Sequence, residues 1–387
     1  CWDALMTAFS RLDSSLLGRW WWTVDRWTIT ALIVLAAAGA ILTLAASPPV
    51  AERLNLDTFY FARRQLLVLP VAIGMMLAVS LLNRDGVRRL ALLMFTVSIV
   101  LTALTLVGGA EIKGATRWIK LGGLSVQPSE FVKPAFAVIA AWMFAAWRLK
   151  EKFPGYLVAV GLYASVVALL LAQPDVGMTV LVSVVWGIQF FLAGLPMVLV
   201  MAIGVLFIVG GFVAYFKFDH VQVRIDRFFD PAGTDAYQVA RSLEAFQNGG
   251  IFGRGPGEGR IKEALPDAHA DFIFAVAGEE FGMFASLMIV ALFGIIVLRG
   301  FTHAFKESDL FVQLAVVGLL AQFGLQAIIN MASTLNLMPT KGMTLPFISF
   351  GGSSMLAVSI GMGMVLALTR ERPKRRISGL NSWESGA

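Results

Sequence analysis

The sequence predicts an all-α, multi-pass membrane protein with about ten transmembrane helices and one large structured loop outside the membrane, between helices seven and eight. Two observations support this class. First, the 387-residue chain is 58% hydrophobic and only 14% charged, whereas about a quarter of the residues in a typical soluble domain are charged. Second, its apolar residues are gathered in segments of about 17 or more, the length that a helix needs to cross a bilayer.

These apolar segments define ten predicted spans, several of which are short or contain Gly or Pro. They cover residues 27–46, 66–82, 90–108, 131–148, 156–172, 176–193, 196–215, 272–298, 310–331 and 352–369. An even number of spans places both termini on the same side of the membrane. Lys and Arg are concentrated in the segments on that side, most strongly in the tail "RERPKRR". Because short cytoplasmic segments are enriched in Lys and Arg, both termini are predicted to be cytoplasmic.

Three regions follow from this topology. Residues 1–26 form a cytoplasmic or interfacial N-terminal segment, residues 27–369 a single transmembrane domain, and residues 370–387 a basic cytoplasmic tail. The motif "LLGRWWWTVDRW" in the first region predicts an interfacial helix, because Trp side chains favour the headgroup region.

The net charge of +6 is explained by the topology of the chain rather than by nucleic-acid binding. With three His and one Cys, a disulfide framework or a His/Cys metal site is improbable.

The loop at residues 216–271 is predicted to lie outside the membrane, on the periplasmic side. It is not of low complexity, and connections of this length inside a compact domain are usually functional or disordered. Its stretch "AYQVARSLEAFQNGG" predicts an amphipathic helix that ends at Gly249 and Gly250. We expect a structured cap with this helix lying on the membrane surface.

The stretch "LPDAHADFIFAVAGEEFG" places carboxylates at and just inside the start of span eight. Asp271 could act as a general base, because partial burial raises the pKa of a carboxylate toward a useful value; alternatively, it could cap the helix. Glu279 lies deep in an apolar run, where an ionisable group suggests a functional site. Glu279 and the adjacent Glu280 could instead pair with a buried Lys or Arg. His269 is a further candidate contact for a substrate.

A second cluster lies in "GATRWIKLGGLSVQPSEFVKPAF", before and within span four. Arg117 and Lys120 belong to an outer loop, and Glu130 and Lys133 are three residues apart, so they can pair on one face of a helix. Several cations at the outer face suit a diphosphate, since Arg offers two parallel donors and Lys a point charge. The alternative is that these side chains only extend from the interface toward water.

Three glycine-containing stretches complete the candidates. In "TKGMTLPFISFGGSSM", Ser353 and Ser354 supply hydroxyls and are expected to cap span ten. The stretch "GGIFGRGPGEGRIKEALP" lacks the third Gly of a dinucleotide-binding motif. We therefore interpret it as a flexible loop that presents Arg254, Arg260 and Lys262 to an anionic headgroup. In "QPDVG", Asp175 is expected to cap span six.

In their order along the chain, these motifs resemble the SEDS family (shape, elongation, division and sporulation) of membrane peptidoglycan polymerases. "GATRWIKLGGLSVQPSEFVKP", "AQPDVG", "GRGPGEGRIKEALPDAHADFIFAVAGEEFG" and "LPFISFGGSS" carry the resemblance, which extends over about residues 25–370. They are more similar to the cell-division branch than to the elongation branch. The resemblance implies that Asp271 is catalytic and that Glu263, Arg117 and Lys133 belong to the site, with Lys120 a weaker match. Three positions depart from the family pattern: Asp267, Ala270 and Phe350.

The resemblance also implies a reaction. An inverting glycosyltransferase would polymerise lipid II at the outer face of the cytoplasmic membrane, at the division septum, with Asp271 as the base and Mg²⁺ or Mn²⁺ assisting. Expected partners are lipid II, a class B penicillin-binding transpeptidase and other division proteins, and no nucleic acid is expected. The alternatives are a flippase or transporter for lipid-linked precursors and a non-catalytic division scaffold.

Overall fold

The computed structural model describes residues 15–112, 115–121, 124–149, 153–194, 197–217, 234–339 and 342–370, with a few isolated positions between 219 and 226. The N-terminal residues before 15, most of the segment 218–233 and the basic tail after 370 lie outside the described residues. The predictions made for those parts therefore stay predictions.

Ten apolar helices coincide with the ten predicted spans. They are α3 (Arg26–Arg53), α4 (Tyr60–Ser80), α5 (Arg84–Gly108), α6 (Pro128–Leu149), α7 (Gly155–Ala172), α8 (Val176–Leu192), α9 (Met197–Lys217), α13 (Ile273–Lys306), α14 (Leu310–Thr334) and α15 (Gly352–Leu368). Within the part of the chain that the structure describes, seven of them are long and apolar enough to cross a bilayer. The other three contain shorter apolar helical segments: α8, the part Gly204–Lys217 of α9, and α15. The predicted helical, multi-pass class is confirmed.

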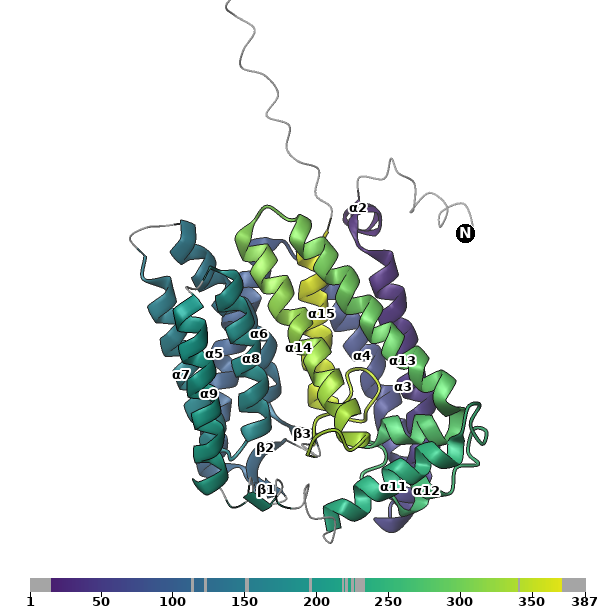
Figure 1. The fold of residues 1–387 in the computed structure, drawn as a ribbon. Coiled ribbons are helices and arrows are strands. Elements are labelled where there is room, and N and C mark those ends of the chain that lie inside the picture. The colour runs from purple at the N-terminus through teal and green to yellow at the C-terminus, as the bar shows by residue number, and fades with distance from the viewer. Residues whose placement is uncertain are drawn as a thin grey trace, which may run out of the picture.

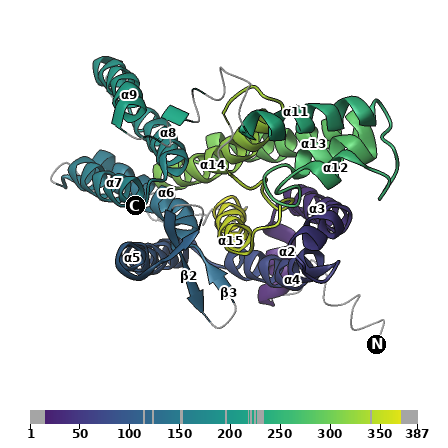
Figure 2. The same cartoon turned by 90° about the horizontal axis from the view of Figure 1, so that it is seen from below.

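Helix α15 lies inside the bundle, where it packs against α4, α6 and α14 (Figures 1 and 2). Nearly all of its residues are buried, so it has no broad face for lipid. The two ends of the described chain lie together, because Arg370 Nε donates to Thr23 Oγ1 over 3.1 Å. Thr23 ends the short helix α2 (Leu16–Thr23), which falls within the predicted interfacial segment.

One segment departs from the helical prediction. Residues between α5 and α6 form a small antiparallel sheet of β1 (Ala110–Ile112), β2 (Ala115–Leu121) and β3 (Leu124–Val126), in the order β1-β2-β3. The run "TRWIKL" has the β-branched and aromatic residues that favour strands, and "LGGL" is a typical hairpin sequence. The sequence therefore contained a signal for strands, but it is weaker than the apolar pattern of the neighbouring spans.

The large loop carries helices α11 (Thr234–Gly249) and α12 (Ile261–Ala264), which lie across one end of the bundle near the start of α13 (Figure 1). Helix α11 matches the predicted amphipathic helix: it ends at Gly249, and Gly250 then adopts a positive φ of 57°. Ser242 and Ala245 on α11 are buried, and α11 packs against α13.

Helix α13 is interrupted at Gly282, whose φ of 78° and ψ of −175° are not helical. The backbone of the loop at residues 250–255 lies at this break and forms hydrogen bonds with the amides and carbonyls of α13 that lack a partner within the helix. Four bonds do so: Met283 N to Gly250 O (2.9 Å), Phe284 N to Ile251 O (3.2 Å), Arg254 N to Glu279 O (3.0 Å) and Gly255 N to Glu280 O (2.9 Å). Unpaired backbone groups are costly at this depth, so the glycine-rich loop completes a broken membrane helix. This fixed pairing corrects the expectation that the loop is flexible.

Replacing Gly282 by Ala should destabilise the protein by about 2 kcal/mol or more, because a side chain strains the positive φ and its Cβ would approach Gly253 N to 2.4 Å. Gly294 on the same helix is the matched control, since a Cβ there meets nothing within 4 Å. Gly294→Ala should be neutral or slightly stabilising. Thermal unfolding of the purified variants measures both effects, and equal melting temperatures would contradict the role given to the break.

Candidate active site

Asp271 lies two residues before α13 and is partly buried. The N-cap residue of α13 is Phe272, whose side chain makes no capping hydrogen bond. The helix-cap interpretation of Asp271 is therefore wrong. The Asp271 carboxylate lies beside the segment 342–350, because a Cβ added to Gly342 would be 3.5 Å from Asp271 Oδ2.

The backbone before α13 is held by donors from other parts of the chain. Residues 265–272 are mostly in turns, so their carbonyls need partners outside regular secondary structure. Four bonds provide them: Arg53 Nη2 to Leu265 O (2.7 Å), Phe350 N to His269 O (2.9 Å), Ser349 Oγ to Ala270 O (2.6 Å) and Asn330 Nδ2 to Asp271 O (3.0 Å). The position of Asp271 is thus fixed from α3, α14 and the segment before α15.

Helix α14 contributes a polar face that joins the separate sequence clusters. Gln326 and Asn330 are four residues apart, so they lie on the same face, and both are buried. Asn330 Nδ2 donates to Asp271 O and also to Met343 O, over 2.6 Å. Gln326 Nε2 donates to Thr344 O, over 3.0 Å. This face therefore ties the start of α13 to the segment 342–350.

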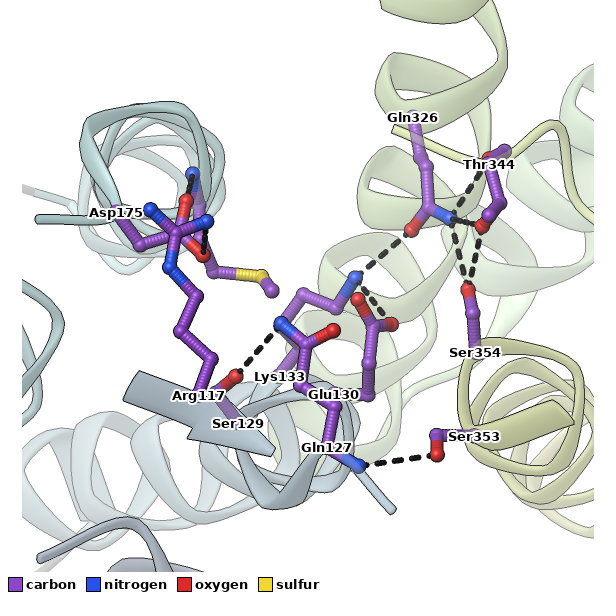
Figure 3. A network of polar contacts seen from close by, with 11 residues as sticks. Arg117, Gln127, Ser129, Glu130, Lys133, Asp175, Gln326, Thr344, Ser353 and Ser354 are labelled. Carbon is purple, nitrogen blue, oxygen red and sulfur yellow. Dashed lines mark hydrogen bonds and ion pairs between the residues drawn. The ribbon is translucent and has the colours of Figure 1, made fainter. Parts of the chain in front are cut away.

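Lys133 is connected to the same face. Its ammonium lies 2.8 Å from Glu130 Oε2 and donates to Gln326 Oε1 over 3.0 Å (Figure 3). Glu130 and Lys133 are both on α6, as the spacing predicted. The Lys133 side chain is only 3% exposed, so its charge is neutralised inside the protein rather than offered to solvent. A chain of contacts therefore leads from α6 through Gln326 to Thr344 and Ser354.

Arg117 and Lys120 differ in their surroundings. Arg117 on β2 binds the turn between α7 and α8: it donates to the carbonyls of Gln173 (3.0 Å) and Pro174 (2.6 Å) and lies 3.1 Å from Asp175 Oδ2 (Figure 3). Its guanidinium thus has structural partners. Lys120 is on the same strand as Arg117, at an odd number of residues from it, so the two side chains project from opposite faces of the strand. The Lys120 side chain is exposed.

Two of the predicted helix caps can be compared with the structure. Asp175 caps α8 by accepting from Met178 N over 3.1 Å, as predicted. The predicted cap of span ten by Ser353 or Ser354 is wrong, since the N-cap of α15 is Gly351. Ser353 Oγ instead accepts from Gln127 N over 3.0 Å and so ties α15 to the segment before α6 (Figure 3).

The two glutamates inside α13 have structural partners. Glu279 is fully buried, and its carboxylate accepts from the backbone amides of Arg260 (2.8 Å), Ile261 (2.8 Å) and Lys262 (3.1 Å). Glu280 forms a buried ion pair with Lys262. These contacts fasten α12 to α13. They also correct the expectation that Lys262 is presented to a headgroup, because its ammonium is buried.

The remaining candidates surround the turn before α13. His269 is buried, with its ring centroid 4.0 Å from that of Phe61 and 5.4 Å from that of Phe350. Glu263 on α12 is exposed, and its carboxylate has no hydrogen-bond or ion-pair partner among the described residues. Arg254 is exposed and donates to the side chain of Asn248 over 2.9 Å. The exposed Glu263 is therefore better placed to meet a ligand than Glu279.

Sequence reasoning missed Gln326 and Asn330, which join the clusters. Their signal was present: span nine has amide side chains at positions 322, 326 and 330, the spacing of one helix face. Polar side chains inside an apolar span are expensive unless they are paired. Attention to neutral amides as well as charged groups would have found them.

Fold and site together define a class: a multi-pass helical membrane protein whose candidate reactive carboxylate is held at one end of the bundle beneath a structured loop. Comparisons with known proteins identify the family. A family model described as "Cell cycle protein", for FtsW, RodA and SpoVE, matches residues 25–374. The chain belongs to this FtsW/RodA/SpoVE family, which confirms the family expected from the motifs.

Two similar relatives are both named "Probable peptidoglycan glycosyltransferase FtsW". The one from Caulobacter vibrioides is 46% identical, over 95% of this chain and 94% of the relative. The one from Trichlorobacter lovleyi is 33% identical, over 87% of this chain and 91% of the relative. The expected similarity to the cell-division branch is thus confirmed.

Two solved structures share the fold. A chain of a peptidoglycan synthase complex that coordinates polymerization and crosslinking has a TM-score of 0.74 at 27% identity, over 89% of this chain and 97% of that chain. The rod shape determining protein RodA of Thermus thermophilus has a TM-score of 0.65 at 27% identity, over 89% of this chain and 96% of that chain.

Proposed function

We propose that this protein is a peptidoglycan glycosyltransferase of the cell-division type, which polymerises lipid II at the outer face of the cytoplasmic membrane. The names of its relatives support the activity. The observation that favours it within the chain is the placement of Asp271, a partly buried carboxylate fixed at a bundle end by α14 and the segment 342–350. A polyprenyl-linked substrate cannot leave the bilayer, so its headgroup must react at such an end.

Asp271 is the proposed general base. It would remove the proton from the 4-hydroxyl of the acceptor sugar as that oxygen attacks the anomeric carbon of the growing strand. The bond to diphosphate would break with inversion. Diphosphate is already a stable anion when it leaves, so one base is sufficient, and the two-carboxylate arrangement of glycosidases is not required.

The leaving diphosphate needs positive charge. Lys133 is neutralised by Glu130, and Arg117 is bound to the turn at Asp175. We therefore propose that both residues position neighbouring parts of the site and do not contact the diphosphate directly. Lys120, which is exposed on β2, is then the better candidate for direct contact. Glu263 on α12 is a proposed contact for the sugar hydroxyls.

A divalent cation is a further proposal. Among the described residues no group of three or more His, Cys, Asp and Glu could hold a metal ion. Mg²⁺, however, is commonly bound by one or two carboxylates together with substrate phosphates, and we propose that Asp271 is one of these carboxylates. The ion would arrive with the substrate and neutralise the diphosphate.

The proposed function predicts that the purified protein, reconstituted with lipid II and no other polymerase, forms glycan strands. Chelation of divalent cations should lower the rate by about tenfold or more, and added Mg²⁺ or Mn²⁺ should restore it. Gel separation of the glycan products measures both results. Movement of headgroups across the membrane without polymer would support a flippase instead, and neither activity would support a scaffold.

A crosslinking partner is also proposed. The structural neighbour from a synthase complex supports assembly with a class B penicillin-binding transpeptidase, and membership of the cell-division branch suggests other division proteins and a septal location. Both termini would lie in the cytoplasm. Co-purification with such a transpeptidase is the direct measurement.

Asn330 provides a test of how Asp271 is positioned. Asn330→Ala removes two donors, to the carbonyls of Asp271 and Met343, so the base can shift within the site. A displacement of about 1 Å can cost roughly 10²-fold in rate. We therefore expect kcat to fall by one to two orders of magnitude with little change in KM. Ser333→Ala on the same helix is the control and should stay near the wild-type rate; equal losses in both variants would indicate a general effect on α14.

A further inference from the structure

A groove of about 540 Å³ lies at the end of the bundle opposite Asp271. It is lined by the end of α2, the turn at Val24 and Asp25, the first residues of α3, the last turns of α13 and Thr369. Because α13 rises 1.5 Å per residue, its Arg299 is roughly 40 Å from the start of the helix near Asp271. The groove is therefore separate from the candidate active site. In Figure 1, α2 lies at one end of the bundle and α12 at the other.

The lining of this groove is cationic. Among the described residues, the lining contains two guanidinium groups, Arg26 and Arg299, and one carboxylate, Asp25. Arg299 Nε donates to Asp25 Oδ2 over 2.7 Å, so these two charges neutralise each other. Burial disfavours the charged form of Asp25, but bonds from Arg299 and Thr28 outweigh it and hold the pKa of this carboxyl below its ordinary value. Asp25 therefore stays ionised and paired.

Arg26 is the excess charge. It has no acidic partner among the described residues, and its guanidinium lies 5.1 Å from the ring centroid of Trp22 and 5.7 Å from that of Trp21. His303 adds a titratable imidazole, whose Nδ1 is 2.8 Å from Arg299 O. An anion in the groove would thus meet a guanidinium that is not paired with any carboxylate of the described residues.

Aromatic and apolar residues around the groove suit an amphiphile rather than a soluble anion. Trp22 and Trp27 line it and are exposed, and indole rings favour the headgroup region of a bilayer. Thr30 and Val34 share one face of α3, and Ile295 and Arg299 share one face of α13, since each pair is four residues apart. Val34 and Ile295 are exposed, so an apolar track leads from the groove along both helices.

We propose that this groove binds the phosphate-bearing headgroup of an anionic phospholipid from the leaflet opposite the candidate active site. Arg26 contacts the phosphate, Trp22 and Trp27 border the headgroup, and the acyl chains follow the track past Val34 and Ile295. Basic pockets between membrane helices on the cytoplasmic side are known to take anionic headgroups. Such a lipid would tie α2 to the ends of α3 and α13.

Lipid-dependent thermal stability tests this proposal without any assay of polymerisation. The purified protein in detergent is titrated with phosphatidylglycerol, with phosphatidylcholine, and with inorganic phosphate at constant ionic strength. A ligand that binds the folded state raises the melting temperature in proportion to its affinity. We expect phosphatidylglycerol to raise it and the other two to have little effect.

Two variants locate the site. Arg26→Gln removes the free guanidinium and should weaken the apparent affinity for phosphatidylglycerol by about tenfold. Thr30→Glu places a carboxylate in the groove at an exposed position and should weaken it similarly, which covers the case that Arg26→Gln does not fold. The control is Arg89→Gln, an exposed residue of α5 that does not line the groove, and it should respond like the wild type.

Three outcomes would overturn the proposal. Equal stabilisation by both phospholipids would show that the groove has no preference for an anionic headgroup. An undiminished response in Arg26→Gln and Thr30→Glu would place the lipid elsewhere. A full, Arg26-dependent effect of inorganic phosphate would make this a site for a free anion.

Discussion

Replacing Asp271 by Asn should lower the rate of lipid II polymerisation by about 10²–10⁴-fold, the usual contribution of a general base. Asn has nearly the same shape but cannot accept a proton at neutral pH. The backbone bonds that hold this position, such as Asn330 Nδ2 to Asp271 O, do not depend on the carboxylate. The loss should therefore appear in kcat, while expression, melting temperature and lipid II binding stay close to wild type.

The matched control for this variant is Asp57→Asn. Asp57 is an exposed carboxylate that pairs with Arg63 near the start of α4, and exposed pairs of this kind contribute little. Initial rates with purified protein and defined lipid II would separate the two variants. Near-normal polymerisation by Asp271→Asn would exclude Asp271 as the general base.

Replacing Glu280 by Ala should produce the largest loss of stability, about 3–5 kcal/mol in the free energy of unfolding. The change leaves the ammonium of Lys262 without its carboxylate partner in a site that is almost closed to water. It also loosens α12, which carries Glu263. The melting temperature of the purified variant in detergent measures the effect, and Glu307→Ala, which breaks a partly exposed pair with Arg84, should stay within about 1 kcal/mol.

A double-mutant cycle isolates the ion pair. Lys262→Met alone leaves a buried carboxylate and Glu280→Met alone leaves a buried ammonium, so each single change should be about as harmful as Glu280→Ala. The combination of Lys262→Met with Glu280→Met removes both charges and fills the space, so it should cost much less than the sum of the single changes. Additive losses would mean that the two side chains do not interact as the structure indicates.

The fold class and most of the helices could be predicted because the bilayer imposes a strong local rule. A span must be long, apolar and internally hydrogen-bonded. Each of these properties depends only on one contiguous stretch of the sequence. The same locality explains why the helix at residues 234–249 and the cap at Asp175 were predicted. The small sheet at residues 110–126 was missed because its pairing signal is short and lies between two strong spans.

The candidate site shows where local reasoning ends. Glu279 looked like a ligand contact because charge inside an apolar run suggests function, and Lys262 did so because it belongs to a basic, glycine-rich loop. In the structure Glu279 on α13 accepts from the backbone of the loop 249–264, and Lys262 in that loop pairs with Glu280 on α13. The same loop completes the break at Gly282. Conversely, Asn330 is uncharged and was not selected from the sequence. Only its hydrogen bonds to the carbonyls of Asp271 and Met343 show that it holds these two segments together.

The sequence by itself determined that this chain is a bundle of membrane helices, where its polar clusters lie along the chain, and which carboxylate opens span eight. These features depend on solvation and on spacing within one helix, so neighbouring residues decide them. Only the tertiary structure decided which charges are neutralised and which stay exposed. That distinction depends on groups far apart in sequence, such as Lys133 and Gln326 or Arg117 and Asp175, because a buried charge is stable only where another part of the chain supplies its partner.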